Sequence, residues 1–343
     1  MGPPVGASPL AMRPEQRLIV IGASAGGVPA LMRLVSELPF EFAAPLLIVQ
    51  HIGTHQSVLP QLLAARSRRD AAHAIDGERL KPGTIRVAPP DHHMLVADGA
   101  IVLNRGPREN LARPAIDPLF RSAALAHGPG VIGVVLTGRL DDGTVGLQEI
   151  KRRGGITVVQ DPEDADEPSM PRSAIRHVEV DHVVPLALMP MLLISLAARD
   201  VAPAPAPPVA GPALAETKLA LHRGKPMELL NEIARPSTYV CPECQGALWQ
   251  ILDSRPTRFR CHTGHAFTAR TLQSAMTESS DQAGWSALRA MQERTLLLHQ
   301  LADLERGAGH DDEAKRLEAS AAHIERQVGV LHQILEDGPE PIE

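Results

Sequence analysis

The feature that most constrains the fold is an alternation of short apolar runs with helical patterns between residues 16 and 199. The runs are rich in β-branched residues, as buried strands are, and they span 18–21, 46–49, 85–88, 131–136 and 156–159. Parallel strands need a crossover between them, and that crossover is usually a helix. The alternation therefore predicts an α/β fold with a doubly wound, mainly parallel sheet. One β-hairpin is predicted over 94–103, because Asp98-Gly99 separates two apolar runs there.

A Pro/Ala-rich tract divides the chain after residue 199. Alternating prolines prevent a helix, so we expect an extended linker. The predicted organisation is a disordered tail, an α/β domain, the linker, a small module that holds all three cysteines, and a helical hairpin. Their predicted ranges are 1–15, 16–199, 200–215, 216–270 and 280–336.

Two apolar stripes predict the helical hairpin. The second stripe alternates spacings of three and four residues without a break, as in a coiled coil, and consists of Ala314, Leu317, Ala321, Ile324, Val328, Leu331 and Leu335. A similar stripe lies upstream, at Leu288, Met291, Leu298 and Leu301. Gly307 and Gly309 separate the two, with Asp311 as the expected N-cap, so an antiparallel pair is the simplest arrangement. This acidic hairpin is a candidate for partner docking or self-association.

The composition argues against nucleic-acid binding and membrane insertion. The net charge is −6 and aromatic residues make up only 2% of the chain, which supplies neither a basic patch nor stacking platforms. The longest uncharged run, 183–198, contains two prolines and is shorter than the ~20 residues that span a bilayer. Three clustered cysteines are too few for a secreted disulfide framework. We therefore expect a cytoplasmic protein.

Side chains suited to nucleophilic catalysis follow three of the predicted strands. Ser24 lies in a glycine-rich strand–turn–helix segment, His51 follows the second run, and Asp141 and Asp142 follow the run at 131–136. Ligands of open α/β sheets bind at the carboxyl ends of strands, and a serine nucleophile needs an imidazole base that a carboxylate orients. The residues alone leave alternatives open, namely a phosphate-binding or structural turn at Ser24, a structural His51, and an Asp pair that caps a helix.

Several motifs resemble the CheB-type protein-glutamate methylesterases of bacterial chemotaxis. They occur in the family's order over about 18–198, at 21–27, 49–52, 87–94, 117–122, 136–143, 160–163 and 169–172. The resemblance implies that Ser24 is the nucleophile, His51 the general base and Asp142, directly before a glycine, the orienting acid. It also implies an oxyanion hole formed by the backbone N–H groups of Ala25 and Arg139.

The implied activity is hydrolysis of γ-glutamyl methyl esters on chemoreceptor-like signalling proteins, with release of methanol and without a cofactor. Family members commonly have Thr and Met where this chain has Ala25 and Arg139. They also typically carry a receiver domain of ~120 residues upstream, whereas fewer than twenty residues precede the first run here. We therefore expect a stand-alone enzyme. Receptor glutamine deamidation by the same triad and a non-catalytic signalling adaptor are the alternatives.

The cysteines predict a structural zinc site. Cys241 and Cys244 form one Cys-x-x-Cys pair, and Cys261 precedes His262 and His265. This donor set and spacing are typical of tetrahedral zinc in a zinc-ribbon-like module. His265 is preferred to His262 as the fourth ligand, since a Gly-His turn leaves more reach. The segment has few large apolar residues, so we expect zinc to serve its folding and the α/β domain to hydrolyse esters independently of it.

Overall fold

The computed structural model describes residues 17–53, 56–201, 211–252 and 254–338, which divide into two units, Met1–Leu272 and Gln273–Glu343. The tail predicted for 1–15 and most of the linker predicted for 200–215 lie outside the described residues. Among the described helices, none has the length and apolar character needed to cross a membrane.

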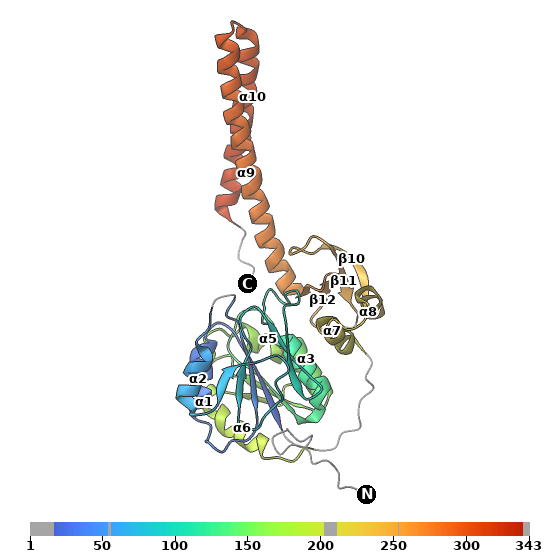
Figure 1. Ribbon diagram of the computed structural model, residues 1–343. Coiled ribbons are helices and arrows are strands. Elements are labelled where there is room, and N and C mark those ends of the chain that lie inside the picture. The colour runs from blue at the N-terminus through green and yellow to red at the C-terminus, as the bar shows by residue number, and fades with distance from the viewer. Residues whose placement is uncertain (1–16, 54–55, 202–210, 253, 339–343) are drawn as a thin grey trace. The chain divides into compact units, whose positions relative to one another are not determined.

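A seven-stranded parallel sheet forms the centre of the first unit (Figure 1), which confirms the predicted α/β fold. Its order is β3-β4-β2-β1-β7-β8-β9, and all neighbours are parallel. The strands are β1 Leu18–Ala23, β2 Leu46–Gln50, β3 Ala71–His73, β4 Ile85–Val87, β7 Val131–Val135, β8 Ile156–Gln160 and β9 His182–Val184. Because the chain leaves β1 for β2 on one side and later returns to β7 on the other, a crevice is expected at the carboxyl ends of these three strands.

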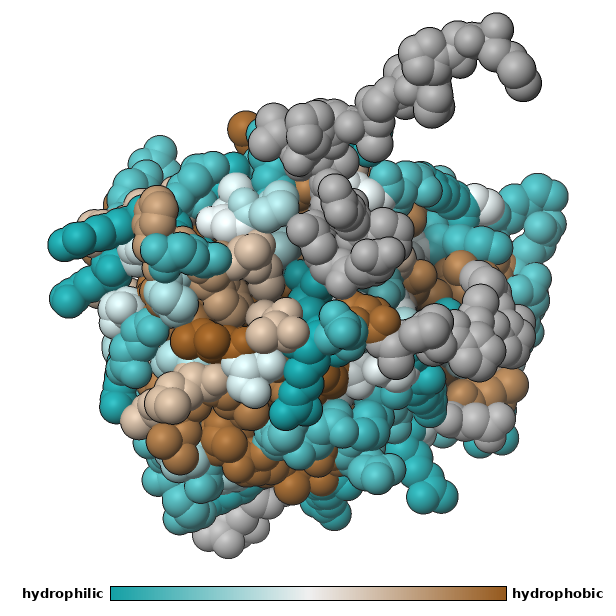
Figure 2. Space-filling model, turned by 90° about the horizontal axis from the view of Figure 1, so that it is seen from below, coloured by the Kyte–Doolittle hydropathy of each residue, from teal (hydrophilic) through white to brown (hydrophobic). Residues whose placement is uncertain are grey.

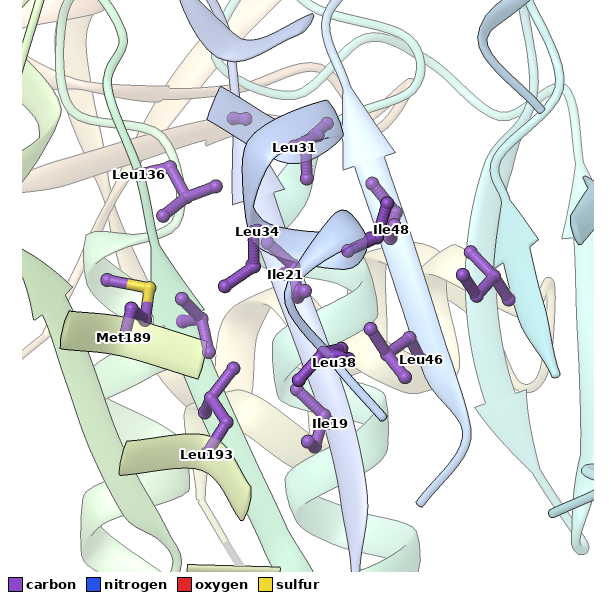
Figure 3. Close-up of a cluster of buried hydrophobic side chains, with 14 of the residues drawn as sticks. Ile19, Ile21, Leu31, Leu34, Leu38, Leu46, Ile48, Leu136, Met189 and Leu193 are labelled. Atoms are coloured by element: carbon purple, nitrogen blue, oxygen red, sulfur yellow. The ribbon is translucent and has the colours of Figure 1, made fainter. Parts of the chain in front are cut away.

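Helices cover both faces of the sheet. Alternate residues of the central strands point to opposite faces, so Ile19 and Ile21 pack with α1, α2 and α6, whereas Leu18 and Val20 pack with α3, α4 and α5. Figure 3 shows the first of these two buried clusters. The helices are α1 Gly27–Ser36, α2 Leu59–Ser67, α3 Ile116–His127, α4 Thr144–Arg152, α5 Ser169–His177 and α6 Met189–Ala197, with short 3₁₀ turns at Gly128–Gly130 and Leu186–Leu188. The sheet is doubly wound, as predicted.

The predicted hairpin is present as β5 His93–Ala97 and β6 Ala100–Asn104, paired antiparallel. It lies outside the parallel sheet and leads into α3 through residues 105–115, which we name the β6–α3 loop. One strand of the sheet, β3, was not predicted. Its three residues are two alanines and a histidine, which form no β-branched apolar run in the sequence.

The rest of the first unit is a small mixed module, which we name the C-terminal module (residues 212–268). It begins with two helices, α7 Pro212–Ala220 and α8 Pro226–Ile233, separated around Gly224, whose φ is +87°. They are followed by an antiparallel sheet of β10 Ala234–Val240, β11 Ala247–Ile251, β12 Arg258–Cys261 and β13 Ala266–Thr268. Because α7 begins at Pro212, the helical structure starts inside the range predicted as linker.

The second unit is the predicted antiparallel helical hairpin, formed by α9 Ala269–Gly307 and α10 Asp311–Asp337. The Trp285 ring contacts the His332 ring edge-on, and His299 pairs with Glu325 at 3.0 Å. Residue numbers therefore increase along α9 while those of the contacting residues on α10 decrease, which makes the two helices antiparallel. The position before α10 is occupied by His310 rather than by the predicted cap Asp311, which is the first helical residue. The α9 helix also begins eleven residues before the predicted start at 280.

Apolar side chains gather on the surface seen in Figure 2. Exposed apolar residues of the α/β domain include Phe40, Leu188 and Met191. The α6 helix, which contains Met191, is therefore apolar both against the sheet and on part of its outer side, which explains the uncharged run at 183–198.

Candidate active site

Three side chains meet where β1, β2 and β7 end. Ser24 follows β1, His51 follows β2, and Asp142 lies in the turn between β7 and α4. The distance from His51 Nδ1 to Ser24 Oγ is 3.2 Å, and His51 Nε2 lies 2.9 Å from Asp142 Oδ2. The structure thus brings the predicted serine, histidine and aspartate into one hydrogen-bonded chain with the imidazole in the middle, which is the arrangement that activates a serine hydroxyl.

The turn at Ser24 depends on close backbone contacts. Gly26 has a φ of +75°, a left-handed conformation that glycine adopts without strain. At Gly138, a Cβ would lie 2.8 Å from the Ser24 Cβ and 2.1 Å from the Met170 sulfur. In the described parts of the chain, the backbone N–H groups of Ala25 and Arg139 donate to no protein acceptor. Both N–H groups are therefore available to an external oxygen.

Asp142 is held by an unusually complete set of donors. Besides His51, its carboxylate accepts from the Asn110 side chain at 2.9 Å and from the backbone N–H groups of Ile116, Asp117 and Gly143 at 2.7, 3.2 and 2.9 Å. Burial acts to raise the pKa of Asp142, but the bonds from His51, Ile116 and Asn110 outweigh it and hold the pKa below the usual range. Asp142 is therefore an anion at neutral pH and can orient the imidazole.

Asp141 has a different environment from its neighbour. Its carboxylate accepts from the Thr268 hydroxyl at 2.9 Å, and burial raises its pKa to about 6. No contact with His51 is found for Asp141 in the described structure. Of the two candidate aspartates, only Asp142 is placed to orient the imidazole.

A second buried carboxylate lies close to Asp142. Asp117, in the first turn of α3, accepts from the Gly146 backbone N–H at 2.6 Å and from the Asn110 side chain at 2.9 Å. The same Asn110 nitrogen thus donates to Asp117 and to Asp142. Burial and the nearby Asp142 charge raise the pKa of Asp117 to about 8, so this second carboxyl carries a proton at neutral pH.

Replacing Asp117 by asparagine is expected to flatten the pH dependence of stability. A carboxyl whose pKa is higher in the folded than in the unfolded chain, about 3.9, stabilises fully below the unfolded value and loses that stabilisation as pH rises through the folded one. For Asp117 the loss extends from about pH 4 to about 8. Urea unfolding should therefore show a smaller fall in stability over this range for Asp117→Asn, while Asp166→Asn, at an exposed position of the same domain, keeps the original slope. Equal slopes for Asp117→Asn and the unchanged chain would contradict this assignment.

Ser24, His51 and Asp142 line a cleft of about 430 Å³. The lining includes Ser24, His51, Asn110, Leu111 and Leu140. Three of these, Asn110, Leu111 and Leu140, have positive φ values of 51°, 65° and 63°. Such strain in residues other than glycine persists only where surrounding contacts enforce it, and it concentrates at functional sites.

Two arginines on the cleft wall are already paired. The Arg139 guanidinium, which is largely exposed, donates to Glu167 at 2.9 and 3.1 Å, and Arg113 pairs with Asp91. The carboxylate of Glu167 therefore offsets much of the charge that Arg139 brings to the cleft.

The predicted zinc ligands also meet. The Sγ atoms of Cys241, Cys244 and Cys261 and a ring nitrogen of His265 all lie within 4.8 Å of one another. Cys261 Sγ is 3.7 Å from Cys244 Sγ and 3.6 Å from His265 Nδ1. His262 instead contacts the Trp249 ring edge-on. The cluster therefore contains the four residues that were predicted.

No role was predicted for Asn110, Asp117 or Thr268, which surround the aspartate pair. Asp117 lies in the motif at 117–122 that resembles the family. That motif was the one feature of the sequence that could have indicated a role for Asp117. Asn110 and Thr268 lie in no motif that we identified, and they are separated by 158 residues.

Comparison with known proteins relates the α/β domain to the CheB methylesterases. The profile of the family "CheB methylesterase" matches residues 19–193. A Leptospira interrogans protein is 41% identical over 184 residues, which cover 52% of this chain and 93% of that protein. The crystal structure of the Thermotoga maritima CheB methylesterase catalytic domain matches with a TM-score of 0.51 and 34% identity, over 53% of this chain and 98% of that one.

Longer relatives match over a similar length of the chain. Proteins named protein-glutamate methylesterase/protein-glutamine glutaminase occur in Bradyrhizobium diazoefficiens, at 44% identity over 165 residues, and in Pyrococcus abyssi, at 37% over 187 residues. The matched regions cover 41% and 50% of these two relatives, and 46% and 53% of this chain. The C-terminal module and the helical hairpin lie outside the region that matches the family profile.

Proposed function

Because the chain belongs to the CheB methylesterase family, we propose that it hydrolyses γ-glutamyl methyl esters on chemoreceptor-like signalling proteins and releases methanol. The observation that carries the proposal is the hydrogen-bonded chain from Ser24 through His51 to Asp142, which opens into the cleft. The names of the Bradyrhizobium and Pyrococcus relatives, which state the same activity, support the assignment.

The proposed mechanism uses only groups of this chain and water. Ser24 Oγ attacks the ester carbonyl while His51 Nδ1, 3.2 Å away, accepts its proton. Asp142 stabilises the resulting imidazolium, and the N–H groups of Ala25 and Arg139 donate to the tetrahedral oxyanion. The imidazolium then protonates the leaving methoxide, and methanol departs from an acyl-enzyme on Ser24. Water, deprotonated by His51, attacks this acyl-enzyme and restores the glutamate and the serine.

Deamidation of receptor glutamines is a second candidate, because the names of the relatives also include protein-glutamine glutaminase. Both reactions pass through the same acyl-enzyme and differ in the leaving group. Receptor substrates carrying a methyl-glutamate or a glutamine at one site, assayed for methanol and for ammonia, distinguish the two. A non-catalytic adaptor would release neither.

The two aspartates provide a prediction about the orienting acid. Asp142→Asn should lower kcat for ester hydrolysis by about 10²- to 10⁴-fold, because an uncharged amide no longer stabilises the imidazolium. Asp141→Asn, its matched control, keeps an oxygen that accepts from Thr268 and should retain kcat within about tenfold. Steady-state methanol release measures both variants. The assignment of the acid is wrong if the Asp141 substitution proves the more damaging one.

We also propose that Cys241, Cys244, Cys261 and His265 bind one structural zinc ion. A tetrahedron with Zn–S bonds of ~2.3 Å has edges of ~3.8 Å, and the distances from Cys261 to Cys244 and to His265 are 3.7 and 3.6 Å. Four protein ligands complete the tetrahedron and leave no position for an activated water. The zinc would therefore stabilise the module and take no part in the ester chemistry.

A further inference from the structure

We propose that the C-terminal module is a positioning element for the active site, in which β13 holds the β6–α3 loop so that Asn110 orients Asp142. Metal binding in the module would then set the activity of the triad. The inference rests on the proposed function, and it replaces the expectation that the α/β domain works independently of the zinc. The module lies outside the region that matches the family, so this control would be specific to chains that carry it.

The loop and the module are joined by backbone hydrogen bonds. The Asn110 N–H donates to the Ala266 carbonyl at 2.8 Å, and the Ala266 N–H donates to the Arg108 carbonyl at 3.2 Å. Glu109 and Ala266 thus form a parallel β-bridge. The loop that lines the cleft is in this way an added edge of the module's sheet, so its conformation depends on β13.

Asn110 transmits this contact to the triad. Its side-chain oxygen accepts from the Thr268 N–H at 3.3 Å, and its nitrogen donates to Asp142 and Asp117, each at 2.9 Å. One end of the amide is therefore held by the module and the other by the carboxylate that orients His51. Because Asn110 and Leu111 have positive φ values, loss of the module's contacts would let the loop relax to a less strained conformation.

A second connection reaches the neighbouring aspartate. The Thr268 hydroxyl donates to Asp141 at 2.9 Å, and both residues are buried. Thr268 thus binds the turn that carries Asp142 as well as the loop that carries Asn110. A single residue of β13 restrains the triad acid from two sides.

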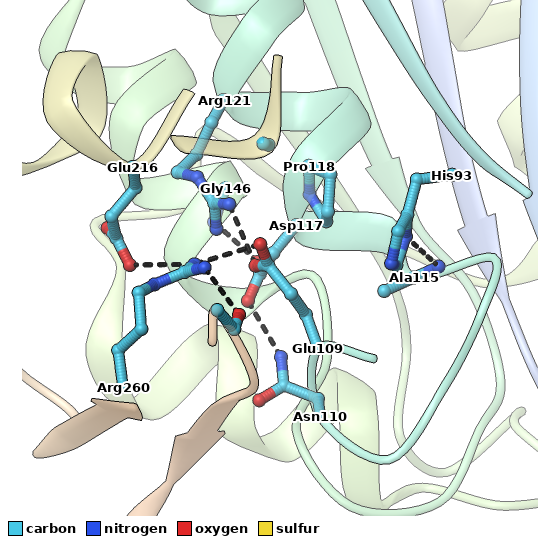
Figure 4. A network of polar contacts seen from close by, with 12 residues as sticks. His93, Glu109, Asn110, Ala115, Asp117, Pro118, Arg121, Gly146, Glu216 and Arg260 are labelled. Atoms are coloured by element: carbon cyan, nitrogen blue, oxygen red, sulfur yellow. Dashed lines mark hydrogen bonds and ion pairs between the residues drawn. The ribbon is translucent and has the colours of Figure 1, made fainter. Parts of the chain in front are cut away.

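Buried ion pairs prevent the module from separating freely from the loop. Arg260 of β12 donates to Glu109 at 2.8 Å and to Glu216 at 3.2 Å, while Arg121 of α3 donates to the other oxygen of Glu109 at 2.8 Å (Figure 4). All four side chains are almost completely buried. Separation would leave Glu109 with one partner fewer in a buried site, which is strongly unfavourable.

Two of the proposed metal ligands lie at the ends of β12 and β13, the strands that contact the β6–α3 loop. Cys261 is the last residue of β12, and His265 directly precedes β13. The turn between these ligands is closed by hydrogen bonds from Cys261 N–H to the His265 carbonyl and from Gly264 N–H to the Cys261 carbonyl, both of 3.0 Å. A metal ion bound to both side chains would fix the direction of β13 after this turn. It would therefore also fix the hydrogen bonds between β13 and the β6–α3 loop.

The test follows the reactivity of Ser24 in the full chain with a fluorophosphonate, which forms an oxygen–phosphorus bond to Oγ and releases fluoride. Removing the metal with a chelator should slow labelling of the unchanged chain by at least about fivefold. Asn110→Ala should slow it by a similar factor. Metal removal from the double variant Asn110→Ala/Thr268→Val should add less than about twofold, because both connections are already broken. Metal removal that slows both chains equally, or neither, overturns the inference.

Matched threonine variants test the module's side of the connection. Thr268→Val removes the hydroxyl bonded to Asp141 and should lower kcat for a soluble ester about fivefold or more without changing KM. Thr277→Val is the control, because among the described residues the Thr277 hydroxyl bonds within α9, to Gln273, and it should leave both constants unchanged. A loss of kcat that is equal in the two variants, or absent from Thr268→Val, contradicts the proposal.

Hydrogen exchange provides a readout that does not depend on catalysis. Metal removal should increase exchange in a peptide covering residues 108–113, whose Asn110 amide bonds to the module. Unchanged protection there, while β12 and β13 become exchangeable, would overturn the coupling. Ser24 labelling that depends on metal, in a chain that releases no methanol from a receptor ester, would instead refute the proposed substrate and leave the coupling intact.

Discussion

Replacing Ser24 by alanine is expected to lower kcat for methanol release from a receptor glutamyl methyl ester by about 10⁴- to 10⁶-fold. The reason is the loss of the only group in the hydrogen-bonded chain that can form the acyl-enzyme. The side chain packs at a glycine-rich turn whose backbone is fixed by other contacts, so the variant should fold. Circular dichroism and thermal unfolding check that it does.

His51→Ala and the double variant are the informative controls. Members of a triad act as one unit, so His51→Ala should cost nearly as much as Ser24→Ala, and the double variant little more than either. Additive losses would mean that the two residues act separately. Retention of signalling by Ser24→Ala in cells, together with no methanol release from the unchanged chain, would favour the adaptor.

The second large effect is expected at the metal cluster. His265→Ala should lower the apparent zinc affinity by more than about 100-fold and destabilise the C-terminal module, because zinc binding contributes directly to the folding free energy of small modules. Titration with a competing chelator and hydrogen exchange of β10–β13 measure the two effects.

His262→Ala is the matched control, since His262 lies three residues away in the same turn and contacts Trp249 rather than the cluster. This variant should keep one zinc ion per chain. If His262→Ala loses the metal and His265→Ala retains it, the fourth ligand has been assigned incorrectly. Loss of metal with no change in the exchange of β10–β13 would contradict a structural role.

The central strands, and the meeting of Ser24, His51 and an aspartate at their ends, could be predicted from the sequence for a physical reason. Parallel strands that alternate with helices place their carboxyl ends at one edge, so Ser24, His51 and the Asp141–Asp142 pair were expected to meet there. The choice between the two aspartates came from the family's motif. The geometry agrees with that choice, because only Asp142 contacts His51.

The contacts around the acid could not be predicted in the same way. Arg260 and Glu109 are 151 residues apart, and neither lies in a repeat or a metal-binding pattern. Asn110 adopts a positive φ without a neighbouring glycine that would mark a turn. Such contacts arise from the packing of the module against the loop, which local sequence patterns do not report.

The central claim is that Ser24 becomes acylated by a receptor glutamyl methyl ester, and mass spectrometry of the reaction tests it most directly. The full chain is mixed with a receptor fragment carrying one methyl-glutamate, quenched with acid at short times and digested. We expect the peptide containing Ser24 to gain the mass of the methylated receptor peptide less one methanol, as an equal amount of methanol appears. Methanol release without this adduct, or an adduct on another residue, would contradict the account.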